Sequence, residues 1–275
     1  MVLLITGPRW PALKWNLSDF NEDSKDEFFL INGHPIFTHE KELEHTSLSL
    51  DSSPEAHQDN NSQNQNPLNK DFDREHTTNT SKVVWDSSIV LSKYIETLVA
   101  LSKLDLNSKR VLELGAGKGV VGIACAILGA TVTLSDAPEA IPTLSEVVRL
   151  NKLNASIPSR GCIERVVALD WISCSQEIFA EDLAHSPFDF IVASDVIWVD
   201  WLVEPLIKTL AGFMNQTTIA YLAYQQRGAR CHPLFLKSMQ ENGLKYNIIP
   251  FQDLHPQYQL GDTIAVYRLE KDSIV

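Results

Sequence analysis

The ten residues Arg110-Val-Leu-Glu-Leu-Gly-Ala-Gly-Lys-Gly119 carry the clearest structural signal in the sequence. The first five are mostly apolar and predict a short buried strand. The apolar run Gly119–Leu128, which ends at Gly129, predicts a helix directly after it. Glycines at such a junction permit a tight turn and let a ligand approach the backbone, while the helix N-terminus offers free N–H groups. The stretch therefore predicts a strand, a ligand-binding loop and a helix.

Strands and helices alternate along the rest of this region. Further strands are predicted at 131–134, 165–169, 188–194, 217–224, 244–250 and 263–269, and further helices at 87–103, 138–153, 201–213 and 233–242. Strands separated by helices form a parallel sheet that is covered on both faces. The last two strands have no helix between them, so we expect an antiparallel hairpin at the sheet edge. The predicted fold is α/β, with a Rossmann-like, mostly parallel sheet of seven strands.

The N-terminal third differs in kind. Residues 28–37 predict a short hairpin with Asn32-Gly33 at its turn, and Pro35 confines the second arm to an edge position. Residues 40–80 contain a polar low-complexity run, which cannot bury enough apolar surface to offset the entropy lost on ordering. We expect an extension over residues 1–81, with a disordered insert at about 40–80, and one folded domain over residues 82–275. The insert has an alternative interpretation as an acidic docking segment.

Charge and cysteine content exclude several classes of protein. The net charge is −12, and residues 1–80 alone hold 14 acidic against 6 basic residues. This balance argues against nucleic-acid binding and against attraction to an anionic membrane. No stretch predicts a secretory signal or a membrane span of about 20 apolar residues. None of the four cysteines forms a C-x-x-C pair, so we expect no metal site, no disulfide framework and a cytoplasmic location, with the nucleus as the alternative.

Two acids define the ligand that suits the glycine loop. Asp136 ends the second strand, 21 residues after Gly115, where a carboxylate can accept both hydroxyls of a ribose. Glu113 precedes the loop and suits a cationic ligand better than a pyrophosphate. The segment Gly117-Lys-Gly-Val-Val-Gly122 also fits the G-x-G-x-x-G pattern of nicotinamide enzymes, but the glycine that follows the strand is Gly115. The charge therefore favours S-adenosylmethionine (SAM), which carries an ammonium and a sulfonium, over NAD.

Aromatic and acidic residues follow the third and fourth strands, where α/β sheets bind their ligands. Asp170 is a candidate partner of the adenine amino group, and Trp171 is a candidate cover for the ring or, alternatively, a core residue. After the fourth strand, Asp195 is a candidate for orienting an acceptor amine, and Trp198 is a candidate for lining the channel through which that amine enters. The alternative for Asp195 is the N-cap of the next helix.

Trp85 precedes the first helix and is a candidate cover for the cofactor, with Asp86 or Ser87 as the expected helix N-cap. Residues 224–227, at the end of the fifth strand, are candidates for the wall of a substrate channel.

Taken together, these motifs resemble lysine methyltransferase family 16, a family of seven-stranded, SAM-dependent methyltransferases, over residues 82–270. The residues that carry the resemblance are Trp85-Asp86, Glu113-Leu-Gly-Ala-Gly117, Asp136, Leu169-Asp-Trp171 and Asp195-x-x-Trp198. The resemblance implies SAM contacts at Trp85, Gly115, Ala116, Gly117, Asp136, Trp171 and Ser194. It also implies that Asp195 and Trp198 lie at the acceptor. The family usually has tyrosine where this chain has Trp198, so a hydroxyl that can bond the acceptor amine is missing.

The resemblance implies methylation of a lysine side chain in a protein substrate, of the kind represented by chaperones or translation factors. We expect a monomer with no nucleic-acid or membrane partner. Three alternatives use the same fold: methylation of a small molecule, methylation of a protein N-terminal amine, and a binding module without catalysis. An enclosed apolar acceptor pocket would favour a small molecule, and failure to bind SAM would favour the binding module.

Overall fold

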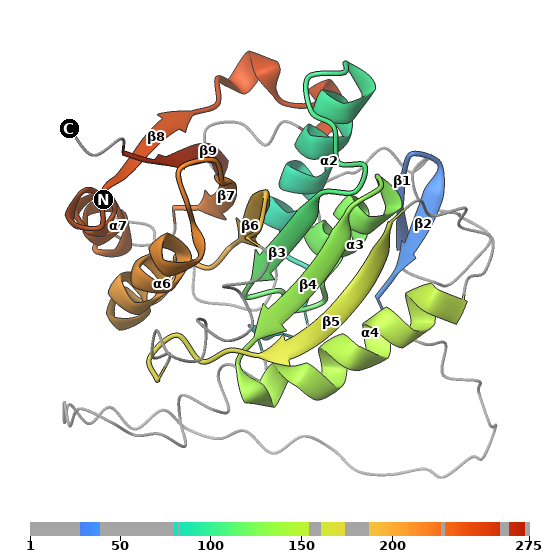
Figure 1. Cartoon of the computed structure of the whole chain (residues 1–275), viewed down its shortest axis with the longest axis horizontal. Coiled ribbons are helices and arrows are strands. Elements are labelled where there is room, and N and C mark those ends of the chain that lie inside the picture. The colour runs from blue at the N-terminus through green and yellow to red at the C-terminus, as the bar shows by residue number, and fades with distance from the viewer. Residues whose placement is uncertain are drawn as a thin grey trace, which may run out of the picture.

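Seven strands form one sheet in the order β5-β4-β3-β6-β7-β9-β8 (Figure 1). In this computed structural model of the chain, the residues described are 28–38, 80–81, 83–153, 161–173, 187–226, 229–258 and 264–272. The strands of the sheet are β3 (Arg110–Leu114), β4 (Thr131–Asp136), β5 (Cys162–Ala168), β6 (Phe190–Ser194), β7 (Ile219–Gln225), β8 (Leu244–Ile248) and β9 (Ile264–Lys271). The helices are α2 (Asp86–Ala100), α3 (Val120–Ile127), α4 (Ile141–Leu153), α6 (Asp200–Phe213) and α7 (Cys231–Glu241).

The sheet is mixed, and its reversed strand lies second from the edge. Strands β5, β4, β3, β6 and β7 pair in parallel, whereas β9 is antiparallel to both β7 and β8. The predicted seven strands and the antiparallel C-terminal pair are confirmed. The chain places β8 outermost and then returns to insert β9 beside β7. The outermost strand therefore runs parallel to β7.

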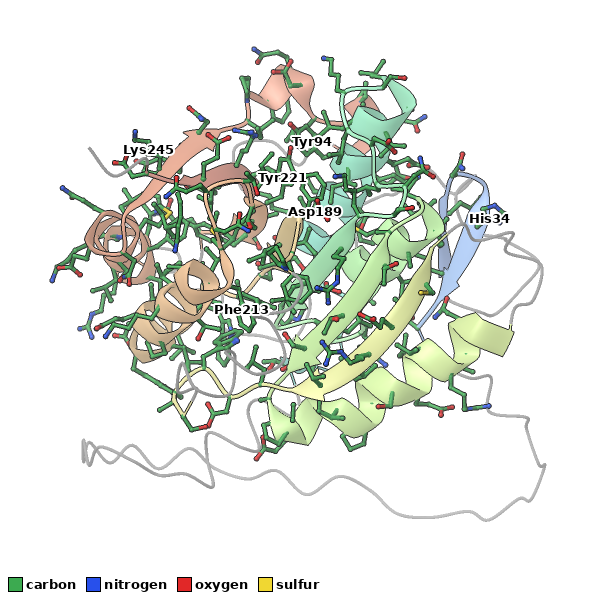
Figure 2. The ribbon with its side chains drawn as sticks, in the orientation of Figure 1. His34, Tyr94, Asp189, Phe213, Tyr221 and Lys245 are labelled. Atoms are coloured by element: carbon green, nitrogen blue, oxygen red, sulfur yellow. The ribbon has the colours of Figure 1, made fainter. Side chains whose placement is uncertain are left out.

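Helices cover both faces of the sheet. One core cluster joins α2, α3 and α4 to one face, and a second joins α6 and α7 to the other. Side chains of a strand alternate between the two clusters, as Val111 and Leu112 of β3 do. On the first face, Tyr94 of α2 meets Tyr221 of β7 edge to face, with ring centroids 6.0 Å apart (Figure 2). The buried rings fix α2 against the sheet.

Several element boundaries differ from the prediction by one to three residues, and three of the differences have a structural reason. The strand β5 begins at Cys162 instead of Arg165, because an edge strand that is half exposed carries a weak apolar signal. The helix predicted at 138–153 opens with a separate 3₁₀ turn, Pro138–Ala140, before α4. At α2 the N-cap position is Trp85, in extended conformation and without a side-chain cap, so the predicted caps at Asp86 and Ser87 are wrong.

The predicted N-terminal hairpin is present and packs on the domain. It consists of β1 (Phe28–Ile31) and β2 (His34–Phe37), joined by a turn in which Asn32 and Gly33 both have positive φ. Ile31 and Ile36 are fully buried within the first core cluster. Figure 1 shows the hairpin beside α3, and β2 contacts both α3 and α4. The segment predicted as a disordered insert, about 40–80, lies almost wholly outside the described residues.

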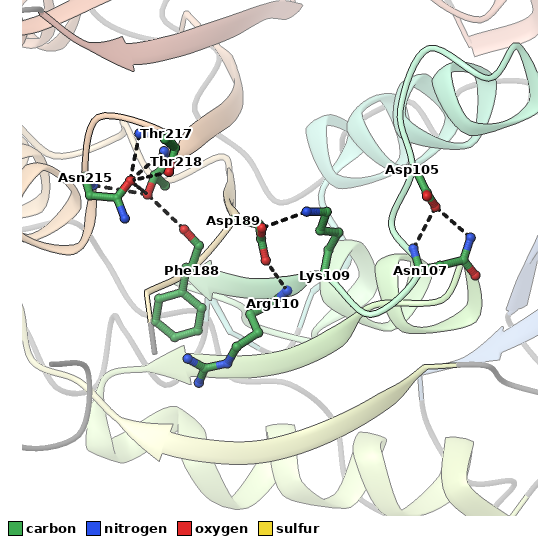
Figure 3. Close-up of polar contacts among 9 residues, drawn as sticks. All are labelled: Asp105, Asn107, Lys109, Arg110, Phe188, Asp189, Asn215, Thr217 and Thr218. Carbon is green, nitrogen blue, oxygen red and sulfur yellow. Dashed lines mark hydrogen bonds and ion pairs between the residues drawn. The ribbon is translucent and has the colours of Figure 1, made fainter. Parts of the chain in front are cut away.

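Polar contacts hold the amino edge of the sheet (Figure 3). Asp189, just before β6, accepts hydrogen bonds from Lys109 Nζ at 3.0 Å and from the backbone N–H of Arg110 at 2.9 Å. Thr218, before β7, donates its hydroxyl to the carbonyl of Phe188 at 2.8 Å. These contacts tie the starts of β3, β6 and β7 together. The opposite, carboxyl edge is left for the loops that carry the sequence motifs.

Candidate functional site

The candidate site lies at the carboxyl edge, where the strand order reverses. From β3 the chain proceeds outward to β4 and β5, and then returns to place β6 on the other side of β3. In open α/β sheets, ligands bind at such a switch point, outside the carboxyl ends of the strands. Gly115 begins the loop after β3 and Asp195 begins the loop after β6. The predicted cofactor and acceptor motifs thus lie at the same switch point.

The glycine loop needs its glycines for backbone conformation. Gly115, Gly117 and Gly119 have φ of +63°, +55° and +69°, in the left-handed region that other residues rarely adopt. The loop is tied to the neighbouring strand by the N–H of Ala116, which donates to the carbonyl of Ser135 at 2.9 Å. The backbone of the loop is thereby fixed against β4 and directed toward the helix N-terminus of α3.

Gly115 brings three predicted motifs together. A Cβ at this position would lie 2.7 Å from Val196 Cγ1 and 3.1 Å from Trp171 Cζ2. Trp171 follows β5, and Val196 lies in the loop after β6, between Asp195 and Trp198. The glycine loop, the Leu-Asp-Trp motif and the Asp195 motif therefore meet at one point. Val196 was not identified from the sequence, because an apolar residue after a strand carries no distinctive signal.

Asp136 holds the loop through both carboxylate oxygens. Its Oδ2 accepts from the N–H of Gly117 at 2.6 Å, and its Oδ1 accepts from the N–H of Ala137 at 2.7 Å. The side chain is buried, and burial raises its pKa while the two N–H groups oppose the rise. A carboxylate oxygen has more than one acceptor position, so these bonds are compatible with a further bond to a hydroxyl.

Glu113 lies beneath the loop with its side chain turned toward α3. Its Oε2 accepts from the N–H of Gly122 at 2.8 Å, and the residue is 1% exposed. Desolvation by burial raises the pKa of Glu113 to about 8. A Cβ at Gly122 would lie 2.2 Å from Leu134 and 2.6 Å from Glu113 Oε2, so only glycine fits there. A glycine inside a predicted helix is the sequence signal that marks such a close approach.

Asp170 and Trp171 differ in their surroundings. Asp170 is exposed and organises its own turn, since Oδ1 accepts from the N–H of Ile172 and Oδ2 from the hydroxyl of Ser173, both at 2.9 Å. Trp171 is half-buried against the second core cluster and against Gly115. Its Nε1 is buried and has no hydrogen-bond partner among the described protein atoms. A buried donor of this kind requires a partner, and a bound ligand beside the loop is one candidate.

Asp195 has an unusual backbone conformation at the end of β6. Its φ is +54°, in the left-handed region, and residues held there cluster at functional sites. The residue is 7% exposed, and its Oδ1 accepts from the backbone N–H of Gln225 at 3.1 Å. The alternative interpretation as a helix N-cap is wrong, because α6 begins at Asp200 with Val199 in the cap position. The strained turn instead fixes the carboxylate at the sheet edge.

The other two predicted residues after β6, Ser194 and Trp198, are less enclosed than Asp195. Ser194 ends β6, where it pairs with Ala223 of β7, and it is half-buried. Trp198 is half-buried in the loop between β6 and α6. From the end of β7, Tyr224 packs into the second core cluster instead of lining a channel. Arg227 lies outside the described residues.

Trp85 approaches the loop from the N-terminal side. Its indole N–H donates to the carbonyl of Thr80 at 3.1 Å. The neighbouring Ser81 lies beside Gly117, whose Cβ, if present, would be 3.7 Å from the Ser81 carbonyl oxygen. The predicted cofactor residues thus come from five segments: the turn before α2, the end of β3 with its loop, the end of β4, the turn after β5 and the end of β6. Among them Asp170 alone is exposed, and its carboxylate is turned into a local bond network.

Two classes of feature are missing from the described part of the chain. No group of three or more histidine, cysteine, aspartate or glutamate side chains there has an arrangement that could hold a metal ion. Among the helices that the structure describes, none has the length and hydropathy to span a membrane.

Comparison with known proteins identifies the family. The family described as lysine methyltransferase matches residues 64–242. EEF1A lysine methyltransferase 3 from Xenopus tropicalis is 33% identical over 70% of this chain and 71% of its own length. Protein N-lysine methyltransferase METTL21A from Danio rerio is 32% identical over 69% of this chain and 77% of its own length.

Among solved structures, a TehB-like SAM-dependent methyltransferase from Corynebacterium glutamicum aligns over 74% of this chain and 97% of its own, with 18% identity and a TM-score of 0.46. Family membership rests on the family match, which covers more than half of the chain, and on the two sequence relatives. The chain belongs to the lysine methyltransferase family.

Proposed function

We propose that this chain transfers a methyl group from SAM to the ε-amine of a lysine in a protein substrate, and that Asp195 and Trp198 receive that lysine. The observation that carries the proposal is the contact of Gly115 with Trp171 and Val196. This contact supports a shared crevice in which a cofactor on the glycine loop would lie next to an acceptor held by Asp195.

The residues at the carboxyl edge fit SAM. A Cβ at position 115 would fill the space between the loop and Trp171, so this close approach requires glycine. Asp136 ends β4 with acceptor capacity for ribose hydroxyls, and Trp171 offers a ring face and an unsatisfied N–H. The buried Asp136 carboxylate holds the loop through the N–H of Gly117, and its negative charge favours an ammonium or sulfonium over a pyrophosphate. Glu113 adds no such charge, because its side chain faces Gly122 and burial raises its pKa to about 8.

When bound, SAM supplies an electrophilic methyl group on a sulfonium. The lysine ammonium would first release a proton to solvent water, and its nitrogen would then form the N–C bond as the S–C bond breaks and S-adenosylhomocysteine leaves. The protein would accelerate the reaction mainly by positioning the lysine next to SAM, because holding two reactants at near-attack distance removes most of the entropic barrier. Lysine must lose a proton before it attacks, and the Asp195 carboxylate, held by the Gln225 N–H, would orient the amine and accept a hydrogen bond from it. Trp198 would provide an apolar wall that excludes water.

A translation factor is the first substrate class to test. One relative is named as a lysine methyltransferase of EEF1A, and the resemblance of the motifs to the family implies the same class or a chaperone. Trp198 in place of the family's tyrosine removes one hydroxyl from the acceptor wall. The aspartate that would orient the amine is retained.

The proposal is tested by incubating the purified chain with methyl-labelled SAM and a cell extract, followed by mass spectrometry of the labelled species. We expect label on a lysine side chain of one protein. The control is Asp195→Asn, since asparagine tolerates the left-handed conformation and can still accept from Gln225. This variant should bind SAM and transfer no label. Label confined to small metabolites, or to a protein N-terminus, would overturn the lysine assignment.

A further inference from the structure

A side chain of the glycine loop reaches the N-terminal hairpin, outside the seven-stranded sheet. Lys118, the only residue between Gly117 and Gly119, donates from Nζ to the backbone carbonyl of Thr38 at 2.9 Å. Thr38 directly follows β2 of the N-terminal hairpin and is 6% exposed. The side chain therefore spans from the loop to a buried backbone carbonyl 80 residues earlier in the chain.

The hairpin is packed firmly on the domain, so a contact with it can restrain the glycine loop. Ile31 and Ile36 are fully buried against the domain. Lys93 of α2, itself 6% exposed, donates to the carbonyl of Leu30 at 2.7 Å and forms an ion pair with Glu96 at 3.2 Å. The backbone N–H of Asn32, in the hairpin turn, also donates to Glu96. Apolar packing and charged groups together immobilise the hairpin.

The glycine-rich backbone of the loop is intrinsically flexible, so a contact that restrains it affects ligand binding. Three glycines with positive φ give it more conformational freedom than any other residues would, and that freedom must be lost when a ligand binds. Backbone contacts tie the loop to β4, where Ser135 and Asp136 accept hydrogen bonds from Ala116 and Gly117. Lys118 adds a restraint toward the hairpin, at the residue next to the one that Asp136 holds.

We propose that Lys118 is a positioning residue, which fixes the glycine loop to the N-terminal hairpin and so makes the hairpin part of the cofactor-binding apparatus. This inference rests on the proposed function, because it assigns SAM to the loop. A preorganised loop raises the affinity for its ligand because less entropy is lost on binding. The hairpin would thus act on the affinity for SAM while touching neither SAM nor the acceptor lysine.

The test compares Lys118→Met with Lys118→Arg in the full chain. Calorimetric titration with SAM should show the dissociation constant of Lys118→Met raised about tenfold, as expected for one lost hydrogen bond from a charged group. Turnover at saturating SAM should stay within about twofold of the wild-type value. Lys118→Arg keeps a donor and should restore the affinity. Lys237→Met is the matched control, since that lysine pairs with Glu241 on the surface of α7.

A merely structural role would lower the melting temperature without SAM and leave the KM for SAM unchanged, which would overturn the inference. Equal SAM affinity of Lys118→Met and the wild type would do the same. If Lys118→Met does not fold, Ile36→Ala provides a second test, because loosening the hairpin should also weaken SAM binding. Unchanged affinity in that variant overturns the inference. A wild-type chain that fails to bind SAM overturns the proposed function and this inference with it.

Discussion

Gly115 has less free space around its Cα than the other glycines of the loop. A methyl group there would meet Val196 and Trp171, and φ is +63°. Gly115→Ala should therefore weaken SAM binding by at least tenfold and lower the free energy of unfolding by about 1–3 kcal/mol. Titration with SAM and urea unfolding measure the two effects.

The matched control is Gly212→Ala in α6, where a Cβ would meet nothing within 4 Å. Because alanine is the better helix former, this variant should keep full SAM affinity and gain about 0.5–1 kcal/mol of stability. If both variants behave alike, the close approach at Gly115 has no part in cofactor binding.

Glu113 should make the free energy of unfolding fall as pH rises. Burial raises its pKa from an ordinary 4.5 to about 8, so between these pH values the folded chain keeps a proton that the unfolded chain releases. The contribution of this group to stability is therefore complete below pH 4.5 and is lost as pH rises toward 8. The loss amounts to at most about 1.4 kcal/mol per pH unit.

Glu113→Gln removes this titration while it keeps an oxygen for the Gly122 N–H. Urea unfolding at several pH values between 5 and 8 should show the wild type losing stability relative to Glu113→Gln as pH rises. Glu204→Gln, at an exposed glutamate paired with Lys208, should keep the wild-type slope. Parallel profiles of wild type and Glu113→Gln would show that Glu113 does not hold its proton.

Sequence alone identifies the residue types of the site better than their partners. The spacing of Gly115, Asp136 and Asp195 relative to predicted strands gives the edge at which they lie, because parallel strands share that edge. It does not reveal that Glu113 faces Gly122 or that Lys118 reaches Thr38. Such contacts depend on the rotation of α3 and on the docking of the hairpin, and no local pattern specifies either.

At the scale of elements, the N-terminal hairpin packs as part of the domain core. Ile36 is fully buried among residues of α2, α3 and α4. Ile36→Ala should therefore cost about 2–4 kcal/mol in a single cooperative unfolding transition. Ile248→Ala, at a side chain of β8 that is 54% exposed, should change stability by no more than about 0.5 kcal/mol. A separate early transition for the hairpin, seen by tryptophan fluorescence or circular dichroism, would contradict this.

Helices and central strands could be predicted closely, whereas edge elements could not. The strand β3 matches its prediction residue for residue, because four of its five residues are buried and three of these four are apolar. The strand β5 lies at the edge, and its partly exposed first three residues were missed, because Glu164 and Arg165 interrupt the apolar pattern. The N-cap of α2 was missed because Trp85 occupies that position without a capping hydrogen bond.

At the scale of the molecule, periodicity predicts seven strands but not their order. The position of β9 between β7 and β8 is a long-range pairing, set by backbone hydrogen bonds that any apolar strand can make. The alternation of helices does predict that the motifs after β3, β4, β5 and β6 share one edge. The contact of Gly115 with Trp171 and Val196 bears out that prediction for the loops after β3, β5 and β6.

Substitutions at the amino edge of the sheet should therefore affect stability, whereas substitutions at the carboxyl edge should affect catalysis. Asp189 links Lys109 and the Arg110 backbone at the amino edge, far along the strands from the glycine loop. Asp189→Ala leaves a half-buried N–H without its acceptor, so it should lower the free energy of unfolding by about 1–2 kcal/mol. Turnover per folded molecule should stay unchanged, because no residue of the candidate site contacts Asp189 among the interactions described.

Asp195→Asn should show the reverse pattern. It keeps the left-handed backbone and the acceptor for Gln225, so stability should change by less than about 1 kcal/mol. Losing the carboxylate that orients the amine should lower turnover by about 10²-fold or more, with SAM affinity retained. Urea unfolding, SAM titration and turnover measured on both variants form a crossed design. Equal losses of turnover in the two variants would mean that Asp195 only supports the folded structure. The binding site of the acceptor lysine would then lie elsewhere along the carboxyl edge.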